Sequence, residues 1–324
     1  MTITSNPALP SLSELPPSYF IHLAEFGAIS LAGEEQSKYL QGQVTCDVNS
    51  ITDSSVITGA HCDAKGKVFS VFRLINRYSH HLLIQPKASI AASLLELNKF
   101  GVFAKVDITQ AQEVSFVALV GAQAPSLLQK HFSQAPDSLT PVIQVGSTTI
   151  VYLSGKQARY ILIDSDDNLH KLITPIKLPI FSQQVWSLLE ISEGFPILSD
   201  EHCRQYVPQM INLQAINGIS FTKGCYLGQE TVARMQYLGK NKRALFTLTT
   251  TLASKLDGND VIEKKLGENW RKAGDILASY QADNGECYFQ AILANDGETQ
   301  VLRLQSQDDS RLTTVALPYS LNSE

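Results

Sequence analysis

The residues of this sequence best suited to chemistry lie in one short stretch, KGCYLGQE at positions 223–230. A thiol, an ammonium, an amide and a carboxylate follow one another closely there, and two glycines allow the backbone to bend and to approach a ligand. The candidate functional residues of this motif are Lys223, Gly224, Cys225, Tyr226, Gly228, Gln229, Glu230 and, shortly after it, Arg234.

Cys225 is the candidate for a working thiol. Residues 231–237 have a helical pattern, so the cysteine lies ahead of a predicted helix and close to Lys223. A helix N-terminus and a nearby ammonium both lower the pKa of a thiol, and the thiolate is the better nucleophile and metal ligand. The alternative is a structural cysteine in the interior, because free cysteines are among the most buried residues.

The remaining cysteines do not indicate a disulfide framework or a metal site. The chain has 5 cysteines at long spacings and no Cys-x-x-Cys pair, which is atypical of zinc knuckles and disulfide-rich domains. The pairs His61-Cys62 and His202-Cys203 are adjacent, and neighbours in a strand point to opposite faces. No metal is therefore expected.

Composition and charge limit the class of protein. Of 324 residues, 44% are hydrophobic and 18% charged, which is typical of a globular chain long enough for two or three domains. No run approaches the roughly 20 apolar residues of a membrane span. The net charge of −5 argues against direct nucleic-acid binding. Basic clusters at 240–243 and 264–272 are either a seat for anionic ligands or, the favoured interpretation, a solvated face.

Residues 1–18 are predicted to form a flexible leader, since they are rich in serine, proline and threonine. They lack the basic and apolar regions of a secretory signal, so a cytoplasmic location is expected.

Residues 19–240 mix strand and helix patterns without strict alternation. Strands at 55–62 and 67–75 flank a hairpin turn, DAKG at 63–66, and helices are predicted at 88–99 and 183–193. This mixture is typical of α+β modules of the ferredoxin-like kind. Short strands with turns at 257–259, 283–285 and 295–297 then predict an antiparallel β-barrel over residues 241–324. The domain boundary is placed near Lys240.

The motif at 223–230 and several distant segments resemble the YgfZ family, folate-binding relatives of the glycine-cleavage aminomethyltransferases that are linked to tRNA modification. The other segments are YLQGQVT at 39–45, AHCDAKGK at 60–67, GFP at 194–196, NKRAL at 241–245 and GENWR at 267–271. Together they extend the resemblance over residues 26–318.

The resemblance implies two interleaved ferredoxin-like domains and a C-terminal barrel around a central hole. It implies folate, as a tetrahydrofolate derivative, as the cofactor. It further implies an accessory role in tRNA modification through assembly or repair of iron–sulfur enzymes, with regulatory effects on replication initiation. Those tRNA-modifying enzymes are the expected partners, bound indirectly or transiently.

One departure from the enzyme pattern concerns catalysis. The resemblance places the catalytic aspartate of the aminomethyltransferases four residues after the turn glycine Gly66, where this chain has Ser70. A serine lacks the negative charge that would stabilise an iminium-like one-carbon centre. One-carbon transfer is therefore not expected.

The resemblance also assigns the folate contacts. Two tryptophans of the family correspond to Trp186 and Phe26, which would stack on the pterin, although core packing is an alternative for both. A pterin-binding glutamate of the enzymes corresponds to Ser192. The neighbouring Glu193 is expected to be a poor substitute, because one residue along a helix rotates the side chain by about 100°.

Two classes of function follow. The first is a non-catalytic folate-binding accessory factor with Cys225 as its thiol, and Ser70 favours it. The alternative is a folate-dependent one-carbon transferase or redox enzyme. Direct tRNA binding is a weaker third possibility.

Overall fold

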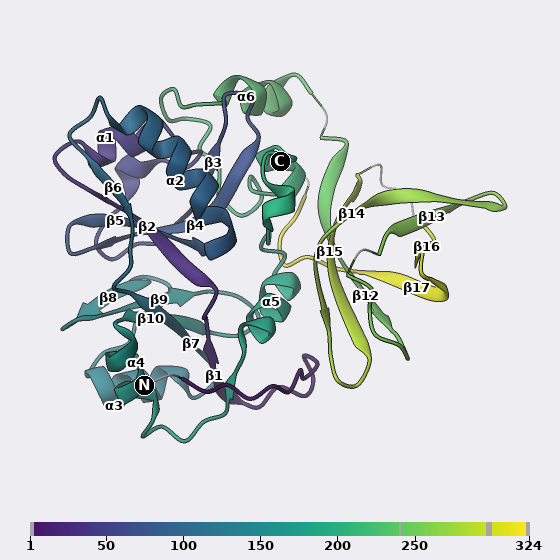
Figure 1. Ribbon diagram of the computed structural model, residues 1–324, viewed down its shortest axis with the longest axis horizontal. Coiled ribbons are helices and arrows are strands. Elements are labelled where there is room, and N and C mark those ends of the chain that lie inside the picture. The colour runs from purple at the N-terminus through teal and green to yellow at the C-terminus, as the bar shows by residue number, and fades with distance from the viewer. Residues whose placement is uncertain (1–2, 240, 259, 296–299, 322–324) are drawn as a thin grey trace.

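The computed structural model describes residues 3–239, 241–258, 260–295 and 300–321. Figure 1 shows two sheets with their helices on one side, a barrel on the other, and helix α5 between them. The predicted α+β architecture with a C-terminal antiparallel barrel is confirmed. The predicted boundary at Lys240 lies outside the described residues.

Sheet A, the lower sheet in Figure 1, has the strand order β11-β1-β7-β10-β9-β8. Its strands are β1 (Ser18–His22), β7 (Ser115–Gly121), β8 (Val142–Val145), β9 (Thr148–Leu153), β10 (Arg159–Asp164) and β11 (Ile180–Phe181). Helices α3 (Ala124–Phe132) and α4 (Asp166–Ile173) pack on one face through Leu128 and Leu169. Helix α4, a short helix capped by the Ser165 side chain, was not predicted from the sequence.

Sheet B has the order β3-β4-β5-β2-β6. Its strands are β2 (Phe26–Ala32), β3 (Ile57–Cys62), β4 (Val68–Arg77), β5 (His80–Pro86) and β6 (Asp107–Gln110). Helix α2 (Lys87–Gly101) covers one face, where Phe72 meets Leu97. Alternate residues such as Ile75 and Ile84 point to the opposite face and share a core with sheet A. The short α1 (Gln36–Gln41) and η1 (Val48–Ser50) lie between β2 and β3.

The chain order interleaves the two sheets. Strand β1 belongs to sheet A, the next five strands build sheet B, and the chain returns to sheet A at β7. Because one core lies between the sheets, residues distant in sequence meet there.

The barrel closes in the order β12-β15-β14-β13-β16-β17. Its strands are β12 (Arg243–Thr251), β13 (Ile262–Leu266), β14 (Asn269–Gln281), β15 (Glu286–Ala294), β16 (Leu302–Leu304) and β17 (Gln307–Val315). The predicted turn at 283–285 is confirmed, with Gly285 at a φ of +88° between β14 and β15. The turns predicted at 257–259 and 295–297 include residues outside the described ones.

Helix α5 (Gln183–Ser192) joins the two halves because it is apolar on both sides. Trp186 and Leu189 enter the core between the sheets, while Leu188 and Ile191 pack against Tyr280 and Tyr288 of the barrel. A long connection follows, with η2 (Asp200–His202) and η3 (Pro208–Ile211), and leads to α6 (Gln229–Tyr237). In the described part of the chain, no helix combines the length and the apolar character that a membrane crossing requires.

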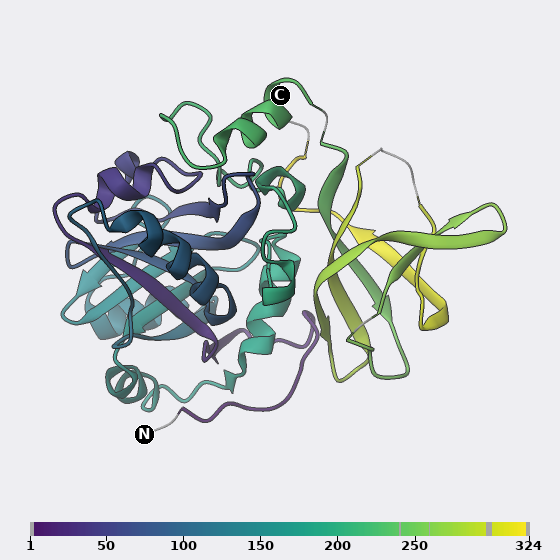
Figure 2. The same cartoon turned by 45° about the horizontal axis from the view of Figure 1, so that its top comes forward.

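The expectation of a flexible leader over residues 1–18 is corrected for the residues that the structure describes. Ile3 is buried in the sheet A core, and the Asn6 N–H donates to the Ile180 carbonyl at 2.6 Å. Figure 2 shows the segment running from the N-terminus toward the barrel, where the Tyr280 hydroxyl donates to the Pro10 carbonyl at 2.7 Å. These contacts are formed with residues far along the chain, so the local composition did not indicate them.

Candidate functional site

The motif at 223–230 packs against two other segments of the family resemblance. Gly228 has a φ of +83°, and a Cβ there would lie 2.4 Å from the Asp63 carbonyl oxygen and 2.8 Å from the Gly66 Cα. On the other side, the Leu227 N–H donates to the Gly42 carbonyl at 3.0 Å. Only glycine suits both the dihedral angle and the space at position 228, so this motif glycine holds the segments together.

Lys223 is turned into the protein. Its Nζ donates to the carbonyl oxygens of Val44 at 2.8 Å and Cys46 at 2.6 Å, and lies 5.1 Å from the centre of the Tyr226 ring. Burial lowers the pKa of the Lys223 ammonium to about 8. Burial also raises the pKa of the Tyr226 phenol. Lys223 therefore anchors the motif to the segment that precedes β3.

Cys225, in contrast, is exposed, as a working thiol requires, whereas Cys46, Cys62 and Cys287 are buried. The two features that were expected to activate it, the Lys223 ammonium and the N-terminus of a helix, do not lie where the sequence suggested. The Lys223 ammonium is bonded to interior carbonyls, and α6 begins only at Gln229, after the N-cap residue Gly228. The exposure of Cys225 is therefore the structural observation that supports the working-thiol interpretation.

The rest of the motif lies at the surface of α6. Glu230 and Arg234 form an ion pair at 3.3 Å with side chains 88% and 71% exposed, a kind of pair that contributes little to stability. The Gln229 N–H donates to the Tyr226 carbonyl at 3.1 Å and closes the turn into the helix. A Cβ on Gly224 would meet no atom within 4 Å, so that position is open.

The two predicted folate contacts, Phe26 and Trp186, touch each other. Their ring centres are 6.2 Å apart at 85°, an edge-to-face arrangement. Both line a cavity of about 80 Å³ between β4, β5, α5 and residues 195–198. Trp186 packs in the core beside Leu189, and its Nε1–H has no hydrogen-bond partner among the described residues. Trp186 thus packs in the core and also lines the cavity.

A buried cluster of charged side chains adjoins this aromatic pair. Glu190 Oε1 accepts from Arg159 Nη1 at 2.7 Å, and Glu190 Oε2 accepts from Arg73 Nη2 at 2.8 Å. The Arg73 guanidinium lies 3.7 Å from the centre of the Phe195 ring, and that of Arg159 lies 5.3 Å from Trp186. These residues were not predicted from the sequence. The available signal was a single charge inside an otherwise apolar stretch, such as VFRLI at 71–75.

A larger cavity of about 500 Å³ lies where β3, β4, β9, β10 and the C-terminal residues meet. Arg73 and Phe195 line both cavities, so the two adjoin, whereas Arg159 and Tyr319 line the larger one. The Tyr319 hydroxyl donates to the Gly194 carbonyl at 2.6 Å, which fixes the C-terminal segment as part of the wall.

Glu193, which was expected to be a poor substitute for the pterin-binding glutamate, lines the larger cavity. Glu193 is the C-cap residue of α5, and its N–H still donates to the Leu189 carbonyl at 3.0 Å. The Glu193 Oε1 accepts from the Lys156 N–H at 2.7 Å. The Ser192 hydroxyl instead donates to the Leu189 carbonyl at 2.8 Å, within its own helix.

Ser70 is fully buried and pairs across the β3–β4 ladder with His61. The His61 Nδ1 lies 2.9 Å from the Ser93 hydroxyl of α2. Neither the Ser70 hydroxyl nor His61 Nε2 has a hydrogen-bond partner in the described part of the protein. Burial lowers the pKa of His61 to about 3, so the ring is neutral in the fold.

The basic clusters at 240–243 and 264–272 are partly balanced. Lys272 lies 2.6 Å from Asp275, and Arg243 lies 4.0 Å from the same carboxylate. Within the described ranges, no three His, Cys, Asp or Glu side chains are grouped so that they could hold a metal ion.

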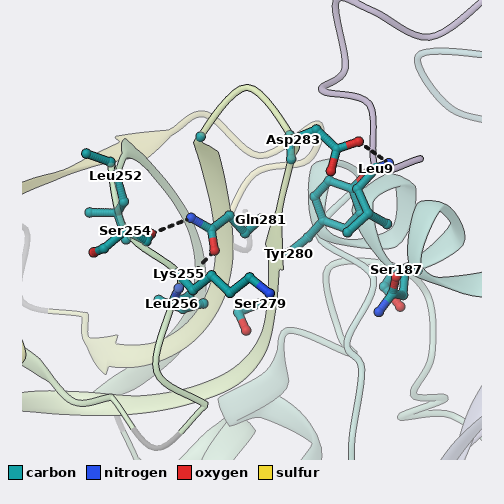
Figure 3. A pocket seen from close by; sticks show the side chains of 14 residues that line it. Leu9, Ser187, Leu252, Ser254, Lys255, Leu256, Ser279, Tyr280, Gln281 and Asp283 are labelled. Carbon is teal, nitrogen blue, oxygen red and sulfur yellow. Dashed lines mark hydrogen bonds between the residues drawn. The ribbon is translucent and has the colours of Figure 1, made fainter. Parts of the chain in front are cut away.

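Another cavity, of about 570 Å³, lies between the leader, α5 and the barrel (Figure 3). Two of its polar side chains, Gln281 and Asp283, are bonded to backbone groups of the same wall. The Gln281 side chain accepts from the Leu256 N–H at 2.8 Å and donates to the Ser254 carbonyl at 2.7 Å. The Asp283 carboxylate accepts from the Leu9 N–H at 2.9 Å. We therefore assign no ligand to this cavity.

Comparisons with known proteins agree with these segments. Residues 241–309 match the family described as YgfZ, beta-barrel domain. The tRNA-modifying protein YgfZ of Colwellia psychrerythraea is 68% identical over 324 residues, which is 100% of both chains. Its namesake in Yersinia enterocolitica is 38% identical over 315 residues, or 96% of this chain and 95% of that one.

A solved structure shares the fold. The glycine cleavage system aminomethyltransferase T from Bartonella henselae aligns with a TM-score of 0.72 at 12% identity, covering 96% of this chain and 86% of that one. At this level of identity the likeness concerns the fold alone.

Proposed function

The chain belongs to the YgfZ family, and on this premise we propose that it binds a reduced folate and supports tRNA modification as an accessory protein. The relatives' name, tRNA-modifying protein, supports the second part. The first part rests on the family resemblance and is consistent with the aminomethyltransferase-like fold.

The observation that carries the folate proposal is the contact between Phe26 and Trp186 at a cavity wall. A pterin is flat and aromatic, so it packs well against such a pair. The unpaired Trp186 Nε1–H offers it a donor, and the Glu193 carboxylate in the adjoining cavity offers an acceptor. The pterin lies against the aromatic pair, and the rest of the folate extends into the larger cavity.

Calorimetric titration with tetrahydrofolate tests this proposal. Trp186→Phe keeps an aromatic ring but removes the N–H, and a lost hydrogen bond of about 1 kcal/mol corresponds to roughly fivefold weaker binding. Trp270→Phe is the matched control, because Trp270 lies on the barrel strand β14 with the Arg303 guanidinium 4.3 Å from its ring. Absence of binding at millimolar folate, or an equal loss in both variants, would contradict the assignment.

The support of tRNA modification is assigned to the exposed Cys225, in exchange of sulfur or transient holding of iron for iron–sulfur enzymes. Cys225→Ser should fold normally and fail to restore tRNA thiolation in a strain that lacks the family member. Cys203→Ser, at a half-buried cysteine, is the control and should restore it. If Cys225→Ser also restores thiolation, the motif acts through other groups and the thiol role is wrong.

The protein is proposed to be inactive as a one-carbon transferase, because Ser70 stands where the resemblance places the catalytic carboxylate. Incubation with tetrahydrofolate and an aminomethyl-carrier protein should give no turnover of methylene groups. Multiple turnovers would favour the enzymatic alternative.

A further inference from the structure

The buried Arg73–Glu190–Arg159 cluster has more positive than negative charge. Two guanidiniums share one carboxylate, and the side chains are between 3% and 6% exposed. Glu193, the acid that lines the larger cavity together with both arginines, makes no ion pair with either of them within the described residues. An uncompensated charge in such a position is costly unless solvent or a counterion reaches it.

The unsatisfied charge faces the larger cavity. Arg73 and Arg159 both line it, and the Arg159 Nε–H is buried without a partner among the described residues. The Arg73 guanidinium lies 3.7 Å from the centre of the Phe195 ring and the Arg159 guanidinium 5.3 Å from that of Trp186, so an aromatic ring supports each of them. Two oriented forks of N–H donors are the usual protein arrangement for a carboxylate.

We propose that Arg73 and Arg159 form a binding subsite for a small carboxylate in the larger cavity, distinct from the folate itself. The distinction rests on the proposed function. If the pterin lies at Trp186, the Arg159 guanidinium, 5.3 Å from that ring, is next to the pterin end of the folate. The glutamate carboxylates are at the opposite end of that molecule, farther along the larger cavity, so a second, small acid is the anion next to Arg159.

The test measures melting temperature in sodium acetate against sodium chloride at equal ionic strength, without folate. Acetate should raise the melting temperature of the native protein in a saturable way, by linkage to the folded state. Arg159→Met leaves the neutral Arg73–Glu190 pair and is expected to fold. It should weaken acetate binding roughly 10- to 100-fold, as expected for a lost charge-assisted contact.

Arg303→Met is the matched control. Arg303 also stacks on a tryptophan, at 4.3 Å from Trp270, and pairs with Glu263 at 2.9 Å, but it lies on the barrel. It should lower stability and leave the response to acetate intact.

A parallel titration with p-aminobenzoyl-L-glutamate, the tail of folate without its pterin, separates the two sources of a carboxylate. The proposal is supported if acetate binding depends on Arg159 and binding of the folate tail does not. If the tail binds in an Arg159-dependent way and acetate does not bind, the proposal of a second ligand distinct from folate is wrong. Equal responses of native protein and Arg159→Met to acetate would overturn the subsite, and neither result depends on whether folate binds.

Discussion

Gly228 lies against Gly66, with 2.8 Å between the position that a Cβ on Gly228 would occupy and the Gly66 Cα. Gly66 ends the hairpin turn before β4, and Gly228 is the N-cap residue of α6. Two segments that are far apart in the sequence are thus joined by a contact between glycines. The exposed Cys225 is held next to this contact.

Gly228→Ala should therefore destabilise the fold. A left-handed alanine costs about 1–2 kcal/mol, and the overlap with the Asp63 carbonyl, 2.4 Å from the Cβ position, adds to this. Gly224→Ala should change the free energy of unfolding by less than about 0.5 kcal/mol, because nothing lies within 4 Å of its Cβ position. Urea denaturation of both variants compares them, and equal stabilities would refute the packing role.

Lys223 should make stability rise with pH. Burial lowers its pKa in the fold from 10.5 to about 8, so below pH 8 the ammonium is charged in both states and its burial cost is fully present. Between pH 8 and 10.5 the unfolded chain binds more protons than the fold. Stability relative to Lys223→Met should then increase by about 1.4 kcal/mol per pH unit. Urea denaturation of both proteins from pH 7 to 10.5 measures this difference, and a flat difference would contradict the buried ammonium.

Ser70 should tolerate loss of its hydroxyl but not gain of a carboxylate. The hydroxyl is fully buried and has no partner in the described region, so Ser70→Ala should be neutral or slightly stabilising. Ser70→Asp would bury an unpaired charge and should cost roughly 3–5 kcal/mol without producing methylene transfer. Thermal unfolding and a turnover assay check both variants. A stable, active Ser70→Asp protein would show that the serine is the main reason for inactivity.

Cys225 should react with a maleimide before every other cysteine, because it is the exposed one. Cys203 is half-buried and should follow, while Cys46, Cys62 and Cys287 should react only when the fold opens. Peptide mapping after short labelling times gives the order. Cys225→Ser should unfold within about 0.5 kcal/mol of the native protein, since the side chain is at the surface. Labelling of a buried cysteine first would contradict this placement.

Local patterns predicted local structure well. The DAKG turn, helix α5 and the turn at Gly285 depend on near neighbours, and each is where the sequence indicates. The leader, by contrast, is ordered by contacts with Ile180 and Tyr280, which no local pattern encodes.

The candidate site could be predicted from the sequence only in part. Trp186 and Phe26 were assigned through family resemblance, and their contact could not be derived from spacing. Lys223 was expected to lie near Cys225 and activate its thiol, but its ammonium points inward and binds the carbonyls of Val44 and Cys46. The Arg73–Glu190–Arg159 cluster was missed because its members come from β4, α5 and β10, which only the fold brings together.

A crystal structure of the protein soaked with tetrahydrofolate would locate the folate. We expect density for the pterin against Phe26 and Trp186, with the remainder of the molecule in the 500 Å³ cavity that Arg73 lines. Density elsewhere, for example in the cavity between the leader and the barrel lined by Leu9 and Gln281, would contradict it.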